Sequence, residues 1–414
     1  MSIGSTHRFR HSEESNITHE VSMTPLNRFT TLALFFSLAV LAAHASQLPP
    51  SAPLTLLTDY PQAKCLDGTP SGYYMQGALD QSSAHKWVIF LEGGGECNTQ
   101  VACQAATTNA LGSSKYFPAS RQWLPFDVLS PLPDANPVFY DWNHVDVTYC
   151  TQDLHSGQVT QPSAEQWGLY FAGRHVFTAV IDSLVAHANL SYATEIVLSG
   201  ASAGGIGVWI HLDYLSQRFP QARVVGLPVA GFYFYAYPYT GLNHSDSGLA
   251  DFRPQAWPHT YSLWQAYADE DCIFALADEP WACLLANYSA PYIHTPTFVV
   301  EAQTDAVVLT AHDWMPSQWR FQPPEQAYMA AWHANMTQGL LPWFDLSDGL
   351  HGVFNPACFT HTSFNISAPL IAGSSYHDAV KRWYYYQPGD LTMLFKLQDD
   401  CGLECNPTCP ASVV

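Results

Sequence analysis

The sequence predicts an α/β fold in which helices flank a mainly parallel central sheet. Short apolar runs rich in β-branched residues alternate with longer segments whose apolar residues recur at helical spacing. Strands separated by helices imply right-handed βαβ crossovers, and these build parallel sheets. The expected strands are KWVIFL at 86–91, HVDVTYC at 144–150, EIVLSG at 195–200, ARVVGLPVAG at 222–231 and TPTFVVEAQ at 295–303.

The segments between these strands are expected to cover the sheet. Residues 164–188 have apolar positions at helical spacing, and a second apolar helical run follows Ser202 directly. Residues 232–292 are rich in Tyr, Trp and Pro and have no clear strand pattern. We interpret them as an aromatic-rich insertion over the top of the sheet, bordering a binding cleft. Residues 46–414 are therefore expected to form a single domain.

The N-terminal 45 residues have the pattern of an extension and a cleaved signal peptide. After Met23 comes one Arg, then an apolar core from Leu32 to Ala43, then the sequence Ala43-His44-Ala45. This position predicts Met23 as the working start codon, or an extended gene model, with cleavage after Ala45. The core is too short for a spanning helix, so a retained anchor is the weaker alternative and no stable membrane insertion is expected after cleavage.

Cysteines and glycosylation sequons agree with export to the extracellular space or cell wall. The chain has 10 cysteines, an even number that fits disulfides in an oxidising compartment. Cys97 and Cys103 are close enough to pair, as are Cys272 and Cys283. For the tail CGLECNPTC, disulfides are favoured over a zinc site, and its pairing stays open. N-glycans are expected at five N-x-[ST] sequons: Asn189, Asn243, Asn287, Asn335 and Asn365.

Composition excludes several classes of partner. The chain of 414 residues has 15 Lys+Arg against 35 Asp+Glu, a formal net charge of −20. Such a charge argues against nucleic acid and anionic membrane surfaces as partners. Charged residues make up only 12% of the chain and aromatic residues 14%, which argues against disorder over most of its length.

The main chemical signal is a Gly-x-Ser-x-Gly motif, Gly200 to Gly204, between an expected strand and an expected helix. A sharp strand-to-helix turn forces its corner residue into a strained conformation, and small neighbours are needed to avoid clashes. Ser202 has only Gly and Ala beside it. The backbone N–H of Ala203 would point to the helix N-terminus, where a developing oxyanion is stabilised. We interpret Ser202 as a nucleophile rather than a structural turn residue.

A serine nucleophile needs a carboxylate and a histidine, in that order along the chain. Asp305 is best placed, because it follows the strand at 295–303 in an expected loop at a carboxyl end. The alternatives are Asp313, Asp345 and Asp348. Spacing does not choose the base: the candidates are His312, His333, His351, His361 and His377, with His351 and His361 in a segment held by Cys358.

A glycine run after the first expected strand of the sheet suggests the second half of an oxyanion hole. Gly93, Gly94 and Gly95 offer backbone N–H groups without an obstructing side chain, and Cys97 can anchor the segment. The spacing does not match the dinucleotide fingerprint G-x-G-x-x-G. No cofactor and no metal are expected.

The motifs FLEGGGEC, VTYCTQDLHSG, SGASAGGIGVWIHLD, EAQTDAVVLT and NPACFTH resemble, in the same order, those of the pectin acetylesterase/Notum family. The resemblance covers about residues 65–364. It implies a secreted, disulfide-bonded serine esterase with an α/β-hydrolase-like fold. It also implies Ser202 as nucleophile, Asp305 as orienting acid and His361 as general base. The implied oxyanion hole consists of the N–H groups of Gly94, Gly95 and Ala203.

Four positions depart from the family pattern and affect the expected substrate. Glu96 replaces an aromatic residue, Thr362 replaces a cysteine, Val229 replaces an acidic residue and His155 replaces an aromatic residue. Three functions remain open. The first is removal of O-acetyl groups from an acylated, pectin-like polysaccharide through an acyl-enzyme. The second is Notum-like removal of a long acyl chain from a protein serine, and the third is a catalytically inactive binding protein.

Overall fold

The computed structural model describes residues 51–123, 128–244, 249, 251–317, 321–345, 349–387 and 394–410. The expected signal segment at 23–45 lies outside these residues. Within them the strands are β1 (Ala52–Leu56), β2 (Gly72–Gln76), β3 (Lys86–Leu91), β4 (Ser120–Arg121), β5 (Asn143–Val147), β6 (Glu195–Ala201), β7 (Arg223–Val229), β8 (Phe298–Val300), β9 (Thr304–Asp305), β10 (Gly352–Asn355), β11 (Phe359–Thr360) and β12 (Lys396–Gln398).

In the described part of the chain, ten strands form one sheet in the order β12-β10-β8-β7-β6-β3-β5-β2-β1-β4. The seven strands from β12 to β5 are parallel, and β2, β1 and β4 add antiparallel pairs at one side. The predicted mainly parallel α/β fold is confirmed. β1 and β2 are absent from the strands expected from the sequence. β1 is extended because it pairs with β2.

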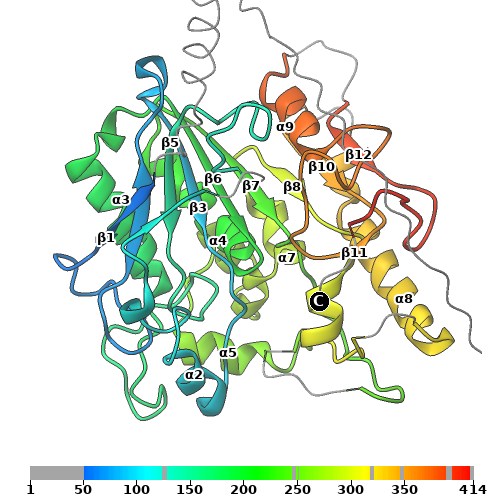
Figure 1. The fold of residues 1–414 in the computed structure, drawn as a ribbon. Coiled ribbons are helices and arrows are strands. Elements are labelled where there is room, and N and C mark those ends of the chain that lie inside the picture. The colour runs from blue at the N-terminus through cyan, green and yellow to red at the C-terminus, as the bar shows by residue number, and fades with distance from the viewer. Residues whose placement is uncertain are drawn as a thin grey trace, which may run out of the picture. The chain divides into compact units, whose positions relative to one another are not determined.

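The helices are α2 (Gln100–Ala106), α3 (Gly173–His187), α4 (Ala203–Arg218), α5 (Trp257–Trp264), α6 (Glu270–Ala275), α7 (Ala286–Ser289), α8 (Pro323–Gly339) and α9 (Tyr376–Tyr384). α4 packs on β3, β6 and β7, whereas α9 packs on β8 and β10. Figure 1 shows α3 beside one side of the sheet and α9 beside β10 and β12 at the other.

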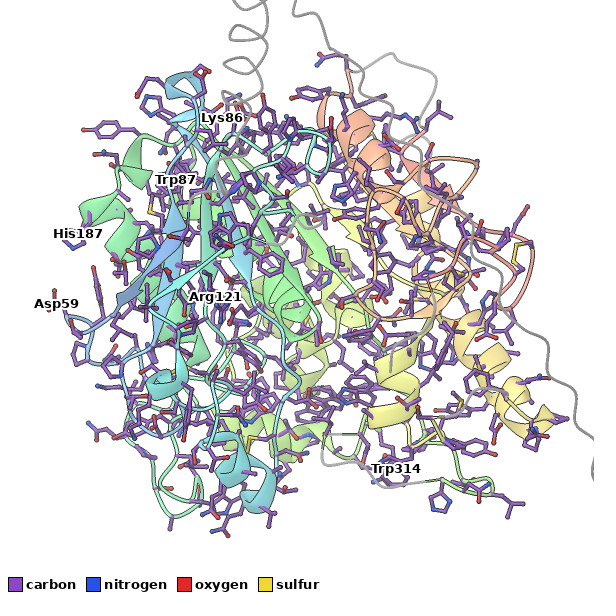
Figure 2. The ribbon with its side chains drawn as sticks, viewed as in Figure 1. Asp59, Lys86, Trp87, Arg121, His187 and Trp314 are labelled. Carbon is purple, nitrogen blue, oxygen red and sulfur yellow. A yellow bond between two sulfur atoms is a disulfide. The ribbon has the colours of Figure 1, made fainter. Side chains whose placement is uncertain are left out.

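The two faces of the sheet bury different side chains, as the period of two in a strand requires. Trp87 and Ile89 of β3 belong to the core cluster that includes the residues of α3 and α4, whereas Val88 belongs to the cluster that includes those of α9. Trp87 is 1% exposed, while its neighbour Lys86 forms an ion pair with Glu195 at 2.9 Å. Figure 2 shows both residues near one end of the sheet.

Two element boundaries differ from the sequence prediction. The helix expected over 164–188 begins only at Gly173, because Trp167 and Gly168 have positive φ angles of 56° and 79° that no α-helix accommodates. The strand expected over 295–303 is regular only at 298–300, after which the chain turns into β9. The insertion at 232–292 has no strand among its described residues and contains α5, α6 and α7.

Five disulfides join all the cysteines: Cys65–Cys150, Cys97–Cys103, Cys272–Cys283, Cys358–Cys409 and Cys401–Cys405. The two pairings suggested by spacing are therefore present, and the tail cysteines form disulfides rather than a zinc site. Cys358, in the segment that contains the candidates His351 and His361, pairs with Cys409 near the C-terminus. Within the described ranges, no helix has the length and apolarity needed to cross a bilayer.

Candidate active site

Ser202 occupies the junction between β6 and α4 in a conformation that few side chains adopt. Its φ and ψ angles are 59° and −123°, and its N–H donates a hydrogen bond to the carbonyl of Val229 at 3.0 Å. The junction is tight: a Cβ added to Gly204 would lie 1.9 Å from the carbonyl oxygen of Leu91, and one on Gly93 would lie 2.9 Å from the Cβ of Ser202. A non-glycine residue in such a conformation costs on the order of 1–3 kcal/mol. The surrounding packing holds Ser202 in this strained turn at the start of α4.

The glycine segment after β3 also needs glycine where it was predicted to form an oxyanion hole. Gly94 has a φ of 149° and Gly95 a φ of 68°. The carbonyl of Gly94 accepts from Nε2 of Gln152 at 3.0 Å, and that of Gly95 accepts from the hydroxyl of Tyr149 at 2.8 Å. In a trans peptide the N–H points opposite to the carbonyl, so the bond to Gly94 fixes the direction of the Gly95 N–H.

Tyr149 and Gln152 belong to the loop after β5, residues 149–155, and this loop makes a third side-chain contact with a backbone carbonyl of the segment after β3. Nε2 of His155 lies 2.9 Å from the carbonyl of Glu92. Burial lowers the pKa of His155 to about 3, so the ring is neutral and this bond fixes the proton on Nε2. Gln152, Leu154 and His155 all have positive φ, which is costly backbone geometry in one short loop. The resemblance had marked this motif, but its contact with the glycine segment was not predicted.

Replacing Gln152 with leucine is expected to lower kcat about tenfold with little change in KM. The change removes the amide that fixes the Gly94 carbonyl, so the Gly95 N–H loses its alignment. Outright loss of an oxyanion donor costs about 100-fold or more. Steady-state kinetics on p-nitrophenyl acetate measures this effect. Gln158→Leu is the matched control, because the Gln158 amide donates to the Gln265 carbonyl at an exposed site. Equal kcat values in the two variants would contradict the prediction.

Asp305 and His361 are brought together by a two-stranded sheet that the sequence did not predict. β9 pairs in parallel with β11, with Asp305 opposite Thr360, so His361 emerges beside the carboxylate. Nδ1 of His361 lies 2.7 Å from Oδ2 of Asp305. Oδ1 of Asp305 accepts from the N–H groups of Val307 and Val308 at 3.0 and 2.9 Å. Asp305 thus lies in a short strand rather than in the expected loop.

Buried groups behind Asp305 further fix its position. The single proton of the Tyr233 hydroxyl is shared between the Ala230 carbonyl at 2.5 Å and Oδ2 of Asp305 at 3.3 Å. Burial, and secondarily the charge of Asp305, raises the pKa of Tyr233 well above its ordinary value, so the hydroxyl remains a donor. Burial likewise raises the pKa of Glu301, which accepts the N–H of Phe232 at 2.8 Å. Tyr233 therefore contacts the same carboxylate oxygen, Oδ2 of Asp305, that His361 contacts.

Most of the predicted site residues line or adjoin one small cavity of about 20 Å³. Ser202, His361, Gly95 and Ala203 all line it, while Asp305 lies behind His361 and Gly94 adjoins Gly95. His312, one of the candidate histidines, also lines the cavity, and the remaining lining was not predicted: Glu96, Ile206, Tyr233, Phe252, Val307 and Val308. Tyr233 and Phe252 belong to the insertion, which was expected to border a cleft.

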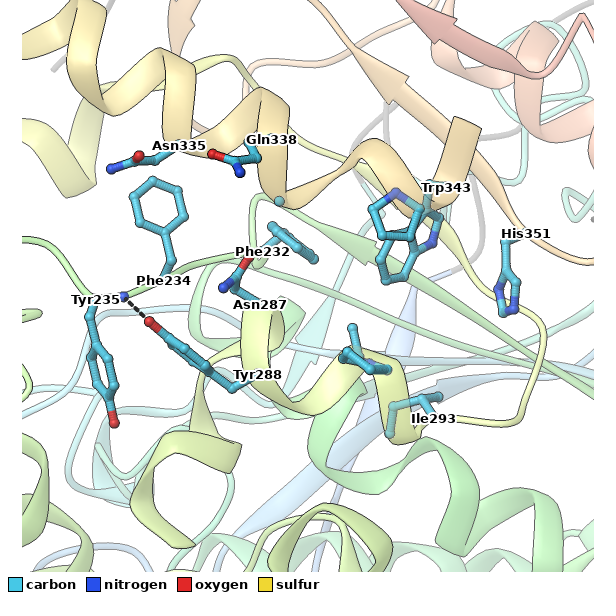
Figure 3. A pocket seen from close by; sticks show the side chains of 14 residues that line it. Phe232, Phe234, Tyr235, Asn287, Tyr288, Ile293, Asn335, Gln338, Trp343 and His351 are labelled. Carbon is cyan, nitrogen blue, oxygen red and sulfur yellow. Dashed lines mark hydrogen bonds between the residues drawn. The ribbon is translucent and has the colours of Figure 1, made fainter. Parts of the chain in front are cut away.

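The competing histidine His351 lies elsewhere. It lines a larger cavity of about 680 Å³, with Phe234, Tyr288 and Trp343, whose described lining does not include Ser202 or His361 (Figure 3). Nδ1 of His351 accepts the N–H of Thr297 at 3.2 Å. Among the alternative carboxylates, Asp348 lies outside the described residues, and the carboxylate recorded in contact with His361 is that of Asp305.

His312 was an unresolved candidate, and it lies in the small cavity next to another unassigned residue. Its Nδ1 is 3.4 Å from Oε1 of Glu96, and the two side chains are only 6% and 3% exposed. The His312 ring stacks on Phe252 with centroids 4.5 Å apart and an interplanar angle of 8°. It ends a π-helical turn, Val308–His312, that begins three residues after Asp305. The one sequence signal for this pair was the departure at Glu96.

Comparisons with known proteins place the chain among esterases. The family model described as pectinacetylesterase matches residues 45–410. Pectin acetylesterase 5 of Arabidopsis thaliana is 29% identical over 372 residues, covering 84% of this chain and 82% of that protein. Palmitoleoyl-protein carboxylesterase notum1' of Xenopus laevis is 27% identical over 367 residues, covering 84% of this chain and 72% of that protein.

The comparison with solved structures agrees. The Wnt deacylase Notum from Drosophila superimposes with a TM-score of 0.73 and 25% identity, covering 87% of this chain and all of that one. The relatives include both acetylesterases and long-chain deacylases, so similarity alone leaves the acyl group open. The family model covers nearly all of the chain beyond residue 45, and the protein therefore belongs to the pectinacetylesterase family.

Proposed function

We propose that the protein is a secreted serine carboxylic-ester hydrolase that removes O-acetyl groups from a pectin-like polysaccharide. The observation that supports acetyl is the size of the cavity at Ser202, about 20 Å³. A volume of roughly 10–15 Å³ on this measure holds one water molecule. An acetyl methyl fits such a space, whereas a long acyl chain requires side chains to move.

In this proposal Ser202 is the nucleophile and His361 the general base. The Ser202 hydroxyl attacks the ester carbonyl and its proton passes to His361, while Asp305 stabilises the imidazolium. The N–H groups of Gly94, Gly95 and Ala203 stabilise the oxyanion. The bond to the sugar oxygen then breaks, and that oxygen takes the proton from His361. Water, deprotonated by His361, attacks the acetyl-serine and releases acetate and free Ser202.

The proposed polymer substrate must lie outside the cavity, because only the acyl group fits within it. Pectin-like polymers bear carboxylates, and this chain has a formal net charge of −20. Like charges repel within a Debye length of roughly 8–10 Å at ordinary ionic strength. A heavily esterified and therefore nearly neutral region of polymer is the favoured target. An acylated protein is the alternative substrate, as in the Notum relatives.

We also propose export through the secretory pathway, with cleavage after Ala45. The five disulfides support an oxidising environment. Of the five proposed glycosylation sites, Asn189, Asn243 and Asn335 are exposed, which suits modification. Asn287 and Asn365 are only partly exposed.

A chain-length series of p-nitrophenyl esters tests the proposed activity on the purified mature chain. We expect kcat/KM to be highest for acetate and to fall by at least about tenfold by butyrate, because each added carbon exceeds the space at Ser202. Preference for esters of eight carbons or more would favour the long-chain deacylase instead. A chain inert on every ester and on acetylated pectin would favour a binding protein.

A further inference from the structure

The small cavity contains two carboxylate–imidazole pairs, and the proposed mechanism uses only one of them. Asp305–His361 is the pair assigned to proton transfer. The second, Glu96–His312, comes from the glycine segment after β3 and from the π-helical turn after β9. Both members are at least nine-tenths buried and both line the cavity with Ser202. Taking charged or strongly polar groups out of water is costly, so their position here requires an explanation.

The cavity that the pair shares with Ser202 indicates which part of a substrate it meets. An acyl group on Ser202 must direct its carbonyl oxygen to the N–H groups of Gly95 and Ala203. These two residues take up one part of the cavity lining. The alkyl end of the acyl group must then use the remaining space, in which Glu96 and His312 are the ionisable pair among otherwise mostly apolar lining: Ile206, Tyr233, Phe252, Val307 and Val308. The sugar is too large for this cavity of about 20 Å³ and must lie outside it.

Because the pair is polar and held in place, it disfavours long acyl chains in two ways. Stacking on Phe252 fixes the plane of the His312 ring, so the end of the cavity cannot easily widen. An alkyl chain that reached the pair would also replace the polar contacts of Glu96 and His312 with contacts to apolar atoms. Burial of a CH2 group normally contributes about 0.8 kcal/mol of stabilisation. Beside this pair, the same CH2 would remove polar contacts from Glu96 and His312, and the cost of leaving those groups unsatisfied offsets the gain.

We propose that Glu96 and His312 together determine acyl specificity, forming a polar end to the acyl cavity that admits acetyl and rejects longer chains. The proposal rests on the proposed esterase function and adds to it the residues that set acyl length. It also assigns a role to Glu96, the position at which this chain departs from the aromatic residue of the family pattern. Here a carboxylate paired with His312 takes that place. Both are specificity-determining residues and neither exchanges a proton with Ser202.

The test compares kcat/KM for p-nitrophenyl acetate and butyrate in the full mature chain and its variants. Glu96→Ala and His312→Ala each remove one member and open space. We expect the acetate-to-butyrate ratio to fall at least tenfold in both. Glu96→Gln keeps the shape and removes the charge, and it should lower the ratio about threefold. The control is His294→Ala, because His294 pairs with Asp271 at 3.2 Å on the exposed surface. Its ratio should equal that of the wild type.

The outcomes separate this proposal from the proposed function. If the wild type prefers acetate and folded Glu96→Ala and His312→Ala keep the wild-type ratio, the specificity role is wrong and the esterase function stands. If the wild type itself prefers butyrate or longer esters, the acetylesterase function fails first. Should the alanine variants not fold, Glu96→Gln decides. Inhibition of that variant and of the wild type by methylboronic and propylboronic acids, which match acetyl and butyryl groups, then gives the same comparison without turnover, and an unchanged ratio again refutes the role.

Discussion

Ser202→Ala is expected to reduce kcat on acetate esters by on the order of 10⁵-fold, with no loss of folding stability. Removal of the nucleophile from a serine hydrolase leaves only the contribution of the oxyanion hole and binding. Alanine has the same Cβ as serine and tolerates the φ of 59° no worse, so the junction between β6 and α4 should be unchanged. Kinetics on p-nitrophenyl acetate and the thermal unfolding midpoint measure the two effects.

Ser199→Ala provides the matched control for this experiment. Ser199 is fully buried in the same strand, and its hydroxyl donates to the carbonyl of Leu227 at 2.8 Å. Loss of that bond should destabilise the fold by about 1 kcal/mol and leave kcat intact. If Ser202→Ala retained more than about 1% of wild-type activity, the nucleophile assignment would be wrong.

Asp305→Asn is expected to lower kcat by about 10⁴-fold, the effect of the equivalent change in serine proteases. Oδ1 of Asp305 accepts the N–H groups of Val307 and Val308. The amide oxygen of the variant must stay at that position, so its NH2 group faces Nδ1 of His361. An NH2 donor there favours the tautomer with its proton on Nε2, and that nitrogen can then no longer accept the serine proton.

Asp213→Asn separates this effect from simple loss of a buried carboxylate. Asp213 is 5% exposed and also accepts two backbone N–H groups, those of His294 and Thr295, at 2.8 and 2.9 Å. It should lose stability and retain kcat. Equal losses of kcat in the two variants would show that Asp305 acts through the fold rather than through His361.

The residues predicted best from sequence are those whose surroundings are local. The strand at 195–200, the corner at Ser202 and the helix after it are contiguous, and steric limits at the corner require small neighbours. β6, Ser202 and α4 follow this order in the structure. The tight turn after β3 was equally predictable, because glycine adopts positive φ angles without steric cost, and Gly94 and Gly95 both do so.

The partner histidine was not predictable from spacing. His361 lies 56 positions after Asp305 and reaches it through the pairing of the two-residue strands β9 and β11. Strands this short leave no periodic pattern, so the resemblance to a family, rather than periodicity, distinguished His361 from His351. The helix at 173–187 shows the same limit, because positive φ at Trp167 is not readable from apolar spacing.

The α/β class, the order of the main strands and the strained turn at Ser202 were predictable from the sequence, because each depends on local pattern and on sterics between neighbours in the chain. The surroundings of Ser202 became visible in the folded chain. Glu96 and His312 line one small cavity because strand pairing and helix packing bring distant segments together. The acyl group that fits depends on the space left between those segments, and no single segment specifies that space.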